Sequence, residues 1–260
     1  MKLGCSTLLY GGYDLDTAIE GMKKAGYEAI ELCSIPGMGE HFKSGECCGA
    51  YAAIKDKLAA AGLFLESVGC SGALGTERFV PLMKAAAEMG APYMTLGTGG
   101  VSDDEHSWQE MMAVTRAALY VCEQTGVKLS VKPHVRAAVY SIASSIRFME
   151  EIDSKWVGLN LDNTHLQRVG DDPIEAVNAL QDWIFTIRIR DYRSEDLSIG
   201  PVENQIPGKG MANVKGYYEA CCKVPGLEYV VVEMVGSKDF ELPEVQRVVE
   251  ETIAALKSYG

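Results

Sequence analysis

The sequence has few histidines and lacks the short motifs that mark several common classes of protein. Only four of its 260 residues are His. Its eight cysteines include no CxxC pair, which argues against zinc ribbons and thioredoxin-like redox sites. It contains no run of Lys or Arg, and its formal net charge is −12 at pH 7. Binding to nucleic acid depends on cations that meet phosphates, so we do not expect a nucleic-acid partner.

Long apolar segments are also missing. No stretch approaches 18 apolar residues free of charge, so we expect no membrane-spanning helix. The N-terminus lacks a long apolar core and a small-residue cleavage site, so we expect no signal peptide. The cysteines are then expected to be reduced thiols in a cytoplasmic protein, with a catalytic cysteine as the alternative.

The sequence does contain a regular alternation of short apolar runs with longer segments of helical period. The predicted strands are 2–7, 29–33, 64–69, 93–97, 128–132, 157–162, 185–190 and 229–233. The predicted helices are 16–25, 49–61, 77–89, 107–125, 141–152, 173–180, 214–222 and 242–258. A glycine directly follows each of the first four helices, where a left-handed residue commonly ends a helix.

This alternation predicts an α/β fold with a parallel sheet. Eight strand–helix units in 260 residues favour a closed barrel, which typically needs about 250 residues. No GxGxxG follows the first strand, which weakens the dinucleotide-binding alternative. No linker or low-complexity tract divides the chain. We therefore predict a single (β/α)8 TIM barrel domain over residues 1–260.

Charged residues end four consecutive predicted strands. Lys132, Asp162, Arg188 and Glu233 each follow an apolar residue. Active sites of TIM barrels lie at the carboxyl ends of the strands, so these side chains are expected to converge there. Each could instead be solvated, but the apolar runs favour enclosure, and enclosed charges need partners. The first four strands contribute little that ionises.

At these strand ends the sequence resembles the xylose isomerase-like barrels, the sugar phosphate isomerase/epimerase superfamily. The motifs are LDNTH at 161–165, RIRD at 188–191, PGKG at 207–210 and VE at 232–233, and the resemblance covers the whole chain. The superfamily includes ketose 3-epimerases, inosose isomerases and dehydratases, hydroxypyruvate isomerases and, more distantly, endonuclease IV. The resemblance implies a carbohydrate-active isomerase, epimerase or related lyase that moves a proton next to a sugar or keto-sugar carbonyl.

The resemblance also implies a divalent metal, Mn, Mg or Zn, held by Glu, Asp, His and Glu on strands five to eight. Asp162 and Glu233 match two of these ligands, whereas Lys132 and Arg188 stand where the family has Glu and His. A unit positive charge about 4 Å from a divalent ion repels it by roughly 8 kcal/mol at an effective dielectric of about 20. We therefore predict that the metal is lost, with Asp162 and Glu233 as remnant ligand positions and no cofactor.

The resemblance suggests how these residues would act. Glu233, Asp162 or a histidine would move the proton, and Lys132 and Arg188 would stabilise the developing enolate in place of the metal. A Schiff base on Lys132 is a further alternative. In the family, the positions that match His134 and His165 approach substrate oxygens or transfer protons; the alternative is a structural role in a loop. Further residues are predicted to bind substrate: Arg190, Arg193, Glu66 and Trp108.

These predicted binding residues have structural alternatives too. Arg190 could pair with its neighbour Asp191, Glu66 could be solvated or lie at the bottom of the barrel, and Trp108 could pack between helices. For the whole protein, the alternative to an enzyme is a degenerate, metal-free barrel that binds a sugar-like ligand or supports a partner subunit. DNA repair of the endonuclease IV kind would need a multi-metal cluster, which four histidines and an acidic balance do not favour. The expected partner is a small sugar or polyol derivative, and family habit implies a homo-oligomer.

Overall fold

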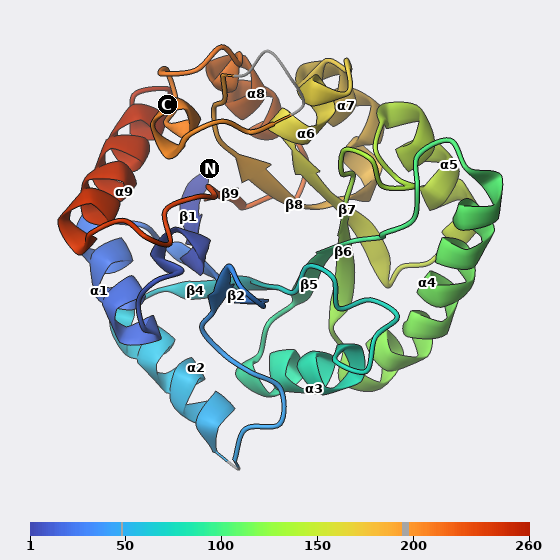
Figure 1. Cartoon of the computed structure of the whole chain (residues 1–260), viewed down its shortest axis with the longest axis horizontal. Helices are drawn as coiled ribbons and strands as arrows, with labels where there is room; N and C mark the ends of the chain where they lie inside the picture. The colour runs from blue at the N-terminus through green and yellow to red at the C-terminus, as the bar shows by residue number, and fades with distance from the viewer. Residues whose placement is uncertain (48, 194–197) are drawn as a thin grey trace.

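The chain forms a barrel of parallel strands surrounded by helices (Figure 1). The computed structural model describes residues 1–47, 49–193 and 198–260. Within these residues the barrel strands are, in chain order, β1 (Lys2–Ser6), β2 (Ala29–Ile35), β4 (Phe64–Gly69), β5 (Tyr93–Gly97), β6 (Lys128–Lys132), β7 (Val157–Asp162), β8 (Ile184–Ile189) and β9 (Tyr229–Val232). A two-residue strand, β3 (Gly39–Glu40), pairs antiparallel with the end of β2.

Hydrogen bonding closes the barrel. Each strand pairs in parallel with the next barrel strand along the chain, and β1 pairs with both β2 and β9. The register places Asp162 of β7 directly beside Arg188 of β8, and Lys132 of β6 beside Gly97 of β5. The carboxyl ends of parallel strands share one rim, so the register brings the predicted charged residues to one end of the barrel.

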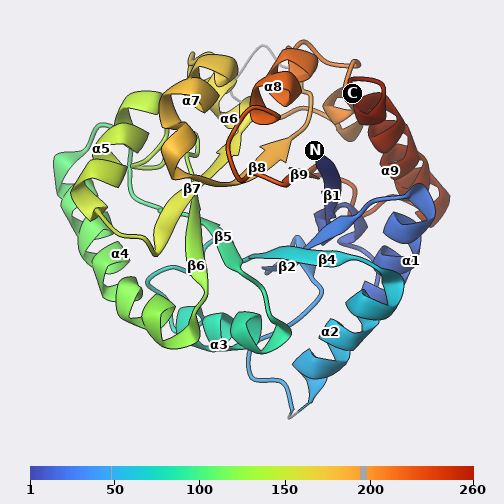
Figure 2. The same cartoon turned by 180° about the vertical axis from the view of Figure 1, so that it is seen from behind.

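Helices cover the outside of the barrel on all sides, as the views from the front and from behind both show (Figures 1 and 2). They are α1 (Leu15–Ala25), α2 (Ala50–Ala61), α3 (Phe79–Met89), α4 (Glu105–Thr125), α5 (Ile142–Ile152), α6 (Asn163–Arg168), α7 (Pro173–Leu180), α8 (Val214–Cys221) and α9 (Leu242–Lys257). The described residues also form three 3-10 helices, η1 (Thr7–Tyr10), η2 (Gln181–Trp183) and η3 (Val202–Gln205). None of the described helices is long and apolar enough to cross a membrane.

Local signals in the sequence explain where the helices begin and end. The glycines after α1 to α4 adopt left-handed conformations, as predicted. Asp172 caps α7, because its carboxylate accepts hydrogen bonds from the amides of Ile174 and Glu175, and Pro173 occupies the first turn. Between the strands and helices lies a continuous apolar core.

The interior of the barrel carries buried charge in addition to apolar side chains. Arg188 is fully buried, and Glu31 and Glu66 are 1% and 4% exposed. Hydroxyl groups share the interior; for example, Ser130 and Thr186 are hydrogen bonded at 2.7 Å. The barrel therefore buries an ion network directly below the rim where the predicted site lies.

The predicted fold is confirmed. The predicted bounds of the strands at 64–69, 93–97, 128–132 and 157–162 match the structure, and the other barrel strands begin or end one or two residues away. The short elements β3 and α6 were not predicted. The structure describes seven of the eight cysteines, all as free thiols, and Cys48 lies outside the described residues.

Candidate active site

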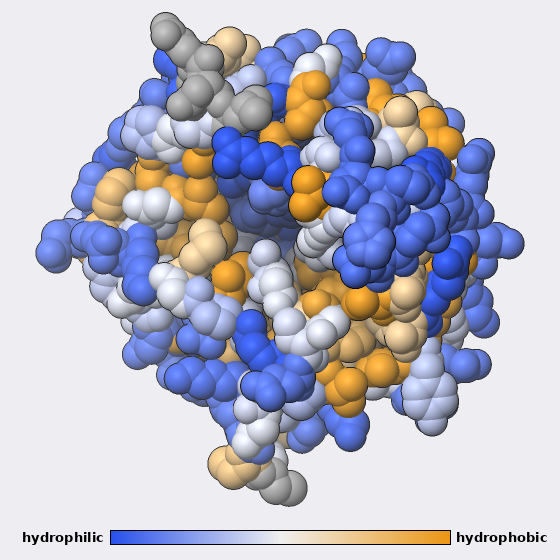
Figure 3. Space-filling model, turned by 45° about the vertical axis from the view of Figure 1, so that its right-hand side comes forward, coloured by the Kyte–Doolittle hydropathy of each residue, from blue (hydrophilic) through white to orange (hydrophobic). Residues whose placement is uncertain are grey.

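A cavity of about 290 Å³ opens at the carboxyl ends of the strands. Its apolar lining comes from Leu8, Ile35, Met38, Leu96, Ile199 and Val235. Its polar lining comes from Glu31, Thr95, Lys132, His134, His165, Arg168, Arg190 and Glu233. The face of the molecule in Figure 3 is hollowed, with hydrophilic residues inside the hollow and hydrophobic residues beside it. Such a cavity suits a small ligand that has polar groups and an apolar face.

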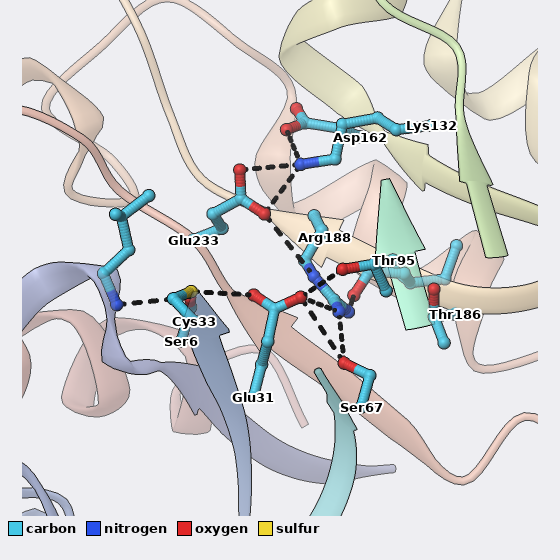
Figure 4. Close-up of polar contacts among 12 residues, drawn as sticks. Ser6, Glu31, Cys33, Ser67, Thr95, Lys132, Asp162, Thr186, Arg188 and Glu233 are labelled. Atoms are coloured by element: carbon cyan, nitrogen blue, oxygen red, sulfur yellow. Dashed lines mark hydrogen bonds and ion pairs between the residues drawn. The ribbon is translucent and has the colours of Figure 1, made fainter. Parts of the chain in front are cut away.

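Lys132 lies between the two carboxylates that the sequence analysis marked as remnant metal ligands. Its Nζ is 2.6 Å from both Oε1 and Oε2 of Glu233, and 3.7 Å from Oδ2 of Asp162 (Figure 4). The side chains are almost removed from water, since Lys132 is 9% exposed and Asp162 is fully buried. The strand ends therefore converge as predicted, and the ammonium group joins the ends of β6 and β7 to Glu233, the residue that follows β9.

Arg188 lies beneath the floor of the cavity. Its Nη2 is 2.6 Å from Glu31 Oε1 and 3.2 Å from Glu66 Oε2, and its Nε is 3.6 Å from Glu233 Oε2. The guanidinium is thus directed toward the barrel interior, and Arg188 is not among the described residues that line the cavity. The expectation of direct contact between Arg188 and an enolate does not fit this placement, because the long side chain extends away from the rim.

Glu31 is a site residue that the sequence analysis did not select. It lines the cavity from β2, and its Oε1 accepts hydrogen bonds from Thr95 Oγ1 at 2.6 Å and from Arg188 Nη2 at 2.6 Å. Burial acts to raise the pKa of this carboxyl, but Arg188, Lys132 and the Thr95 hydroxyl outweigh burial and lower the pKa to about 2. Glu31 is therefore ionised at neutral pH.

Asp162 is held in place by a second group of donors. Arg190 Nη2 donates to its Oδ2 at 2.9 Å, and the amide and hydroxyl of Thr164 donate to its Oδ1. Burial opposes ionisation, but Arg190, His165 and Lys132 lower the pKa of Asp162 below its usual range. Asp162 is therefore a fixed anion, and a carboxylate so stabilised is a poor proton acceptor.

The two predicted histidines stack on each other with ring centroids 3.9 Å apart. Arg190 can only donate, so its contact of 3.3 Å with His165 Nε2 leaves the proton of the neutral ring on Nδ1. His134 Nδ1 donates to the Val135 carbonyl at 2.9 Å, so its Nε2 carries the lone pair. Removal from water lowers the pKa of both imidazoles, well below the usual value for His165. Two residues of the cavity lining thus retain one ring N–H, on the buried Nδ1 of His165, which has no partner among the described residues, and one ring lone pair, on Nε2 of His134.

The structure places the predicted substrate-binding residues Arg190 and Glu66 at different positions relative to the cavity. Arg190 lines the cavity, and it pairs with Asp162 while Asp191 binds backbone amides of the following loop. Glu66 lies beneath the floor and contributes to a small pocket at the other end of the barrel with Phe64 and Tyr229.

The other two predicted substrate-binding residues lie away from the cavity. Trp108 packs between α4 and α5, where Nε1 donates to Glu151 at 3.0 Å and Arg147 stacks on the ring. Arg193 is exposed and donates to the Gly210 carbonyl. Glu66, Trp108 and Arg193 are thus not brought into the described lining of the cavity.

The residues at the position of the family's metal do not fit a divalent ion. An ammonium group cannot act as a ligand, and it engages both oxygens of Glu233, one of the two remaining candidate ligands. In the described part of the chain, no group of three or more His, Cys, Asp or Glu side chains is arranged to hold a metal ion. Loss of the metal remains a prediction, to be tested by measurement of metal content.

Several residues of the cavity were missed for identifiable reasons. Glu31 follows Ile30 in an apolar run, the same signal that marked Lys132, but it lies in the first half of the chain, where the strand ends appeared to carry little charge. Met38 and Ile199 come from loops and carry no chemical signal in the sequence.

The closed barrel and its polar cavity define a TIM-barrel protein with a site at the catalytic face. A family model described as "Xylose isomerase-like TIM barrel" matches residues 19–259, so the chain belongs to this family, and the predicted resemblance is confirmed.

Individual relatives show what kinds of protein share the family or its fold. An inosose dehydratase from Geobacillus kaustophilus is 26% identical over 95 residues, which are 36% of this chain and 31% of that protein's length. The IolI protein, solved with a bound zinc atom, has a TM-score of 0.80 at 17% identity and covers 100% of this chain and 99% of its own. D-allulose 3-epimerase from Methylomonas sp., in complex with D-allulose, has a TM-score of 0.76 at 14% identity, with 100% and 97% coverage. At these identities the solved structures show a shared fold.

Proposed function

We propose that the protein is a carbohydrate-active isomerase, epimerase or related lyase that moves a proton next to a carbonyl group without a divalent metal. The observation that carries the proposal is the ammonium group of Lys132, which lies between Glu233 and Asp162 at the wall of a ligand-sized cavity. Membership of the xylose isomerase-like family and the names of its dehydratase and epimerase relatives support the reaction class. The proposed ligand is a sugar or polyol derivative, and a cytoplasmic location is part of the proposal.

In the proposed reaction, Glu233 is the base. Its carboxylate removes the proton from the carbon next to the carbonyl. The electron pair of the C–H bond forms a carbon–carbon double bond, and the π electrons of the carbonyl move to its oxygen to give an enolate. Lys132 donates a hydrogen bond to this oxygen, because its Nζ is already at the wall of the cavity and carries a full positive charge that a fixed site can direct at an oxyanion. The protonated Glu233 returns the proton to the neighbouring carbon, while the hydroxyl proton passes from one oxygen to the other, and this completes isomerisation. Epimerisation instead needs a second acid that delivers a proton to the opposite face of the original carbon.

Arg188 has an indirect part in this proposal. It contacts Glu31, Glu66 and Glu233 from below and keeps Glu233 at the floor, so we assign it as a positioning residue. His165 and His134 would meet hydroxyl groups of the substrate, one as donor through Nδ1 and the other as acceptor through Nε2.

Exchange of substrate hydrogen with deuterated water tests the proposal. A panel of ketoses, inososes and 3-keto sugars is incubated with the protein in D₂O, and NMR follows loss of the proton next to the carbonyl. We expect exchange with at least one compound, and a loss of about 10²-fold or more in Lys132→Met and in Glu233→Gln. Lys215→Met, on the exposed face of α8, serves as the control. Failure of every compound to exchange would overturn the enzyme proposal.

A second candidate function has its own supporting observation. Both oxygens of Glu233 are engaged by Lys132, which is the geometry expected if the ion pair only preserves a degenerate site. The protein would then bind a sugar-like ligand, or support a partner subunit, without catalysis. A ligand that raises the melting temperature but exchanges no proton would favour this alternative.

A further inference from the structure

Glu31 presents two oxygens with very different surroundings. Oε1 accepts hydrogen bonds from Thr95 at 2.6 Å, from Arg188 at 2.6 Å and from Ser67 at 3.4 Å. For Oε2, the contact found among the described residues is the Cys33 thiol at 4.0 Å (Figure 4). One oxygen is thus fully used to anchor the side chain, and the other has only a weak, distant donor.

This arrangement leaves an unused acceptor beside the cavity. A thiol is a weak donor, and 4.0 Å is long even for sulfur. Glu31 is 1% exposed, so bulk water does not freely solvate the second oxygen. Burial of a charged acceptor without a good donor is costly, and a ligand that supplies a hydroxyl group can recover that cost.

We propose that Glu31 is a specificity-determining residue whose Oε2 accepts a hydrogen bond from a substrate hydroxyl group, so that the cavity selects polyhydroxylated ligands over their deoxy analogues. This rests on the proposed function, because it concerns the same cavity. Arg188 contacts Glu31 through Nη2 and Glu233 through Nε. Glu31 and Glu233 thus approach different nitrogens of one guanidinium group.

The test compares hydroxylated and deoxy ligands in wild type and in Glu31→Gln. Dissociation constants are measured by calorimetry for D-allulose, D-fructose and myo-inosose and for the monodeoxy analogues of the tightest binder. We expect Glu31→Gln to weaken the hydroxylated ligand about tenfold or more, since a hydrogen bond to a charged group is lost. We expect one deoxy analogue to bind wild type and variant alike. Where the reaction can be followed, KM should rise more than kcat falls.

Glu66→Gln is the matched control. It also removes a carboxylate from Arg188, but Glu66 lies beneath the floor and outside the described cavity lining. The dissociation constants of Glu66→Gln for the hydroxylated ligand and for its deoxy analogue should equal those of wild type. If Glu31→Gln does not fold, Glu31→Asp keeps the charge for Arg188 while it withdraws the carboxylate from the cavity, and the same loss of discrimination is expected.

Three results would overturn the inference: equal weakening of hydroxylated and all deoxy ligands, unchanged binding of both, or no binding of any probe to wild type. Deuterium exchange distinguishes this failure from failure of the proposed function. Glu31-dependent binding without exchange would remove the enzyme proposal and leave the inference in place. If substrate exchanges hydrogen equally fast in wild type and in Glu31→Gln, and binding is also unchanged, the enzyme proposal stands and the inference about Glu31 is overturned.

Discussion

Arg188 is the residue on which the buried charge of the barrel most depends. It is fully buried, and its guanidinium lies within 3.6 Å of three carboxylates, those of Glu31, Glu66 and Glu233. A buried ion pair adds little net stability when formed, but removal of one partner leaves the other uncompensated. The interior carboxylates of this barrel are tolerated because one long cation reaches all of them.

We expect Arg188→Met to lower the free energy of unfolding by about 3–5 kcal/mol, because three carboxylates lose their shared counter-ion. Chemical denaturation at pH 7 measures this. Arg116→Met, on the exposed face of α4, is the control and should change stability by less than about 0.5 kcal/mol. An Arg188→Met protein as stable as the control would contradict the assignment of Arg188 as the counter-ion.

The pH dependence of stability should differ in sign between Glu31 and Glu66. The folded pKa of Glu31 is lowered to about 2 from an ordinary 4.5, so its stabilisation is present above about pH 4.5 and is lost as the pH falls toward 2. Burial instead raises the pKa of Glu66, so its contribution is present below 4.5 and is lost as the pH rises through the folded pKa.

Denaturation of Glu31→Gln and Glu66→Gln at pH 7 and pH 3 checks this prediction. The variant Glu31→Gln should be less stable than wild type at pH 7, and this difference should become smaller at pH 3. At pH 3 the Glu31 carboxyl of the wild type is protonated in the unfolded state but ionised in the folded state, so proton uptake favours unfolding. The free energy of unfolding of Glu66→Gln, relative to that of wild type, should be higher at pH 7 than at pH 3, because the buried wild-type carboxyl is costly to ionise. If the unfolding free energies of both variants, relative to wild type, change in the same direction between pH 7 and pH 3, the pKa values of the two carboxyls are not shifted in opposite directions.

At the scale of the strands, the sequence predicted the second half of the site better than the first. The strands β6 to β9 end in an apolar residue followed by a charge, and this pattern was enough to bring Lys132 and Glu233 together. Glu31 on β2 also has apolar neighbours, but it was not selected because the first four strands contribute few ionisable residues. What the pattern could not reveal is that Arg188 extends across the barrel to meet it. Strand periodicity gives the direction of a side chain and not how far it reaches.

One carboxylate holds residues 208–212, which follow β8 in the chain. Asp191 accepts hydrogen bonds from the amides of Tyr192, Gly208, Gly210 and Ala212 at 2.8–3.0 Å. A Cβ atom at Gly210 would lie 2.1 Å from Asp191 Oδ1, so only glycine allows this close approach. Asp191 thus does not pair with Arg190, as one interpretation of the sequence had it, but holds the backbone at Tyr192 and at residues 208–212.

We expect Asp191→Ala to lower the free energy of unfolding by about 3 kcal/mol, because four amides lose a charged acceptor. Thermal unfolding and hydrogen exchange at residues 208–212 measure the effect. Asp56→Ala, on the exposed face of α2, removes an aspartate outside this network and is the control. If exchange at 208–212 is no faster in Asp191→Ala than in the control, the carboxylate does not organise the loop.

For the whole molecule, the sequence predicted the closed barrel because each strand–helix unit repeats the same local pattern. The residues that line the cavity were harder to predict from the sequence. Leu8, Met38 and Ile199 line the same cavity only because the barrel closes and its loops bring them together. Shared fold also does not decide the chemistry of the site. The IolI structure, solved with a zinc atom, and this chain have the same architecture. The sequence resemblance nevertheless predicts that Lys132 and Arg188 replace two metal ligands here.

We therefore expect the purified protein to hold no stoichiometric divalent metal and to melt at the same temperature before and after a chelator. The physical reason is the repulsion of roughly 8 kcal/mol between a unit charge and a divalent ion about 4 Å apart, with Lys132 2.6 Å from both Glu233 oxygens. Lys132→Glu is the informative variant, because it places a third carboxylate beside Asp162 and Glu233. Mn²⁺ or Zn²⁺ should raise its melting temperature, as a ligand that binds only the folded state does. A stoichiometric ion in the wild type, lost in Asp162→Asn, would show instead that the barrel keeps its family's metal despite the lysine.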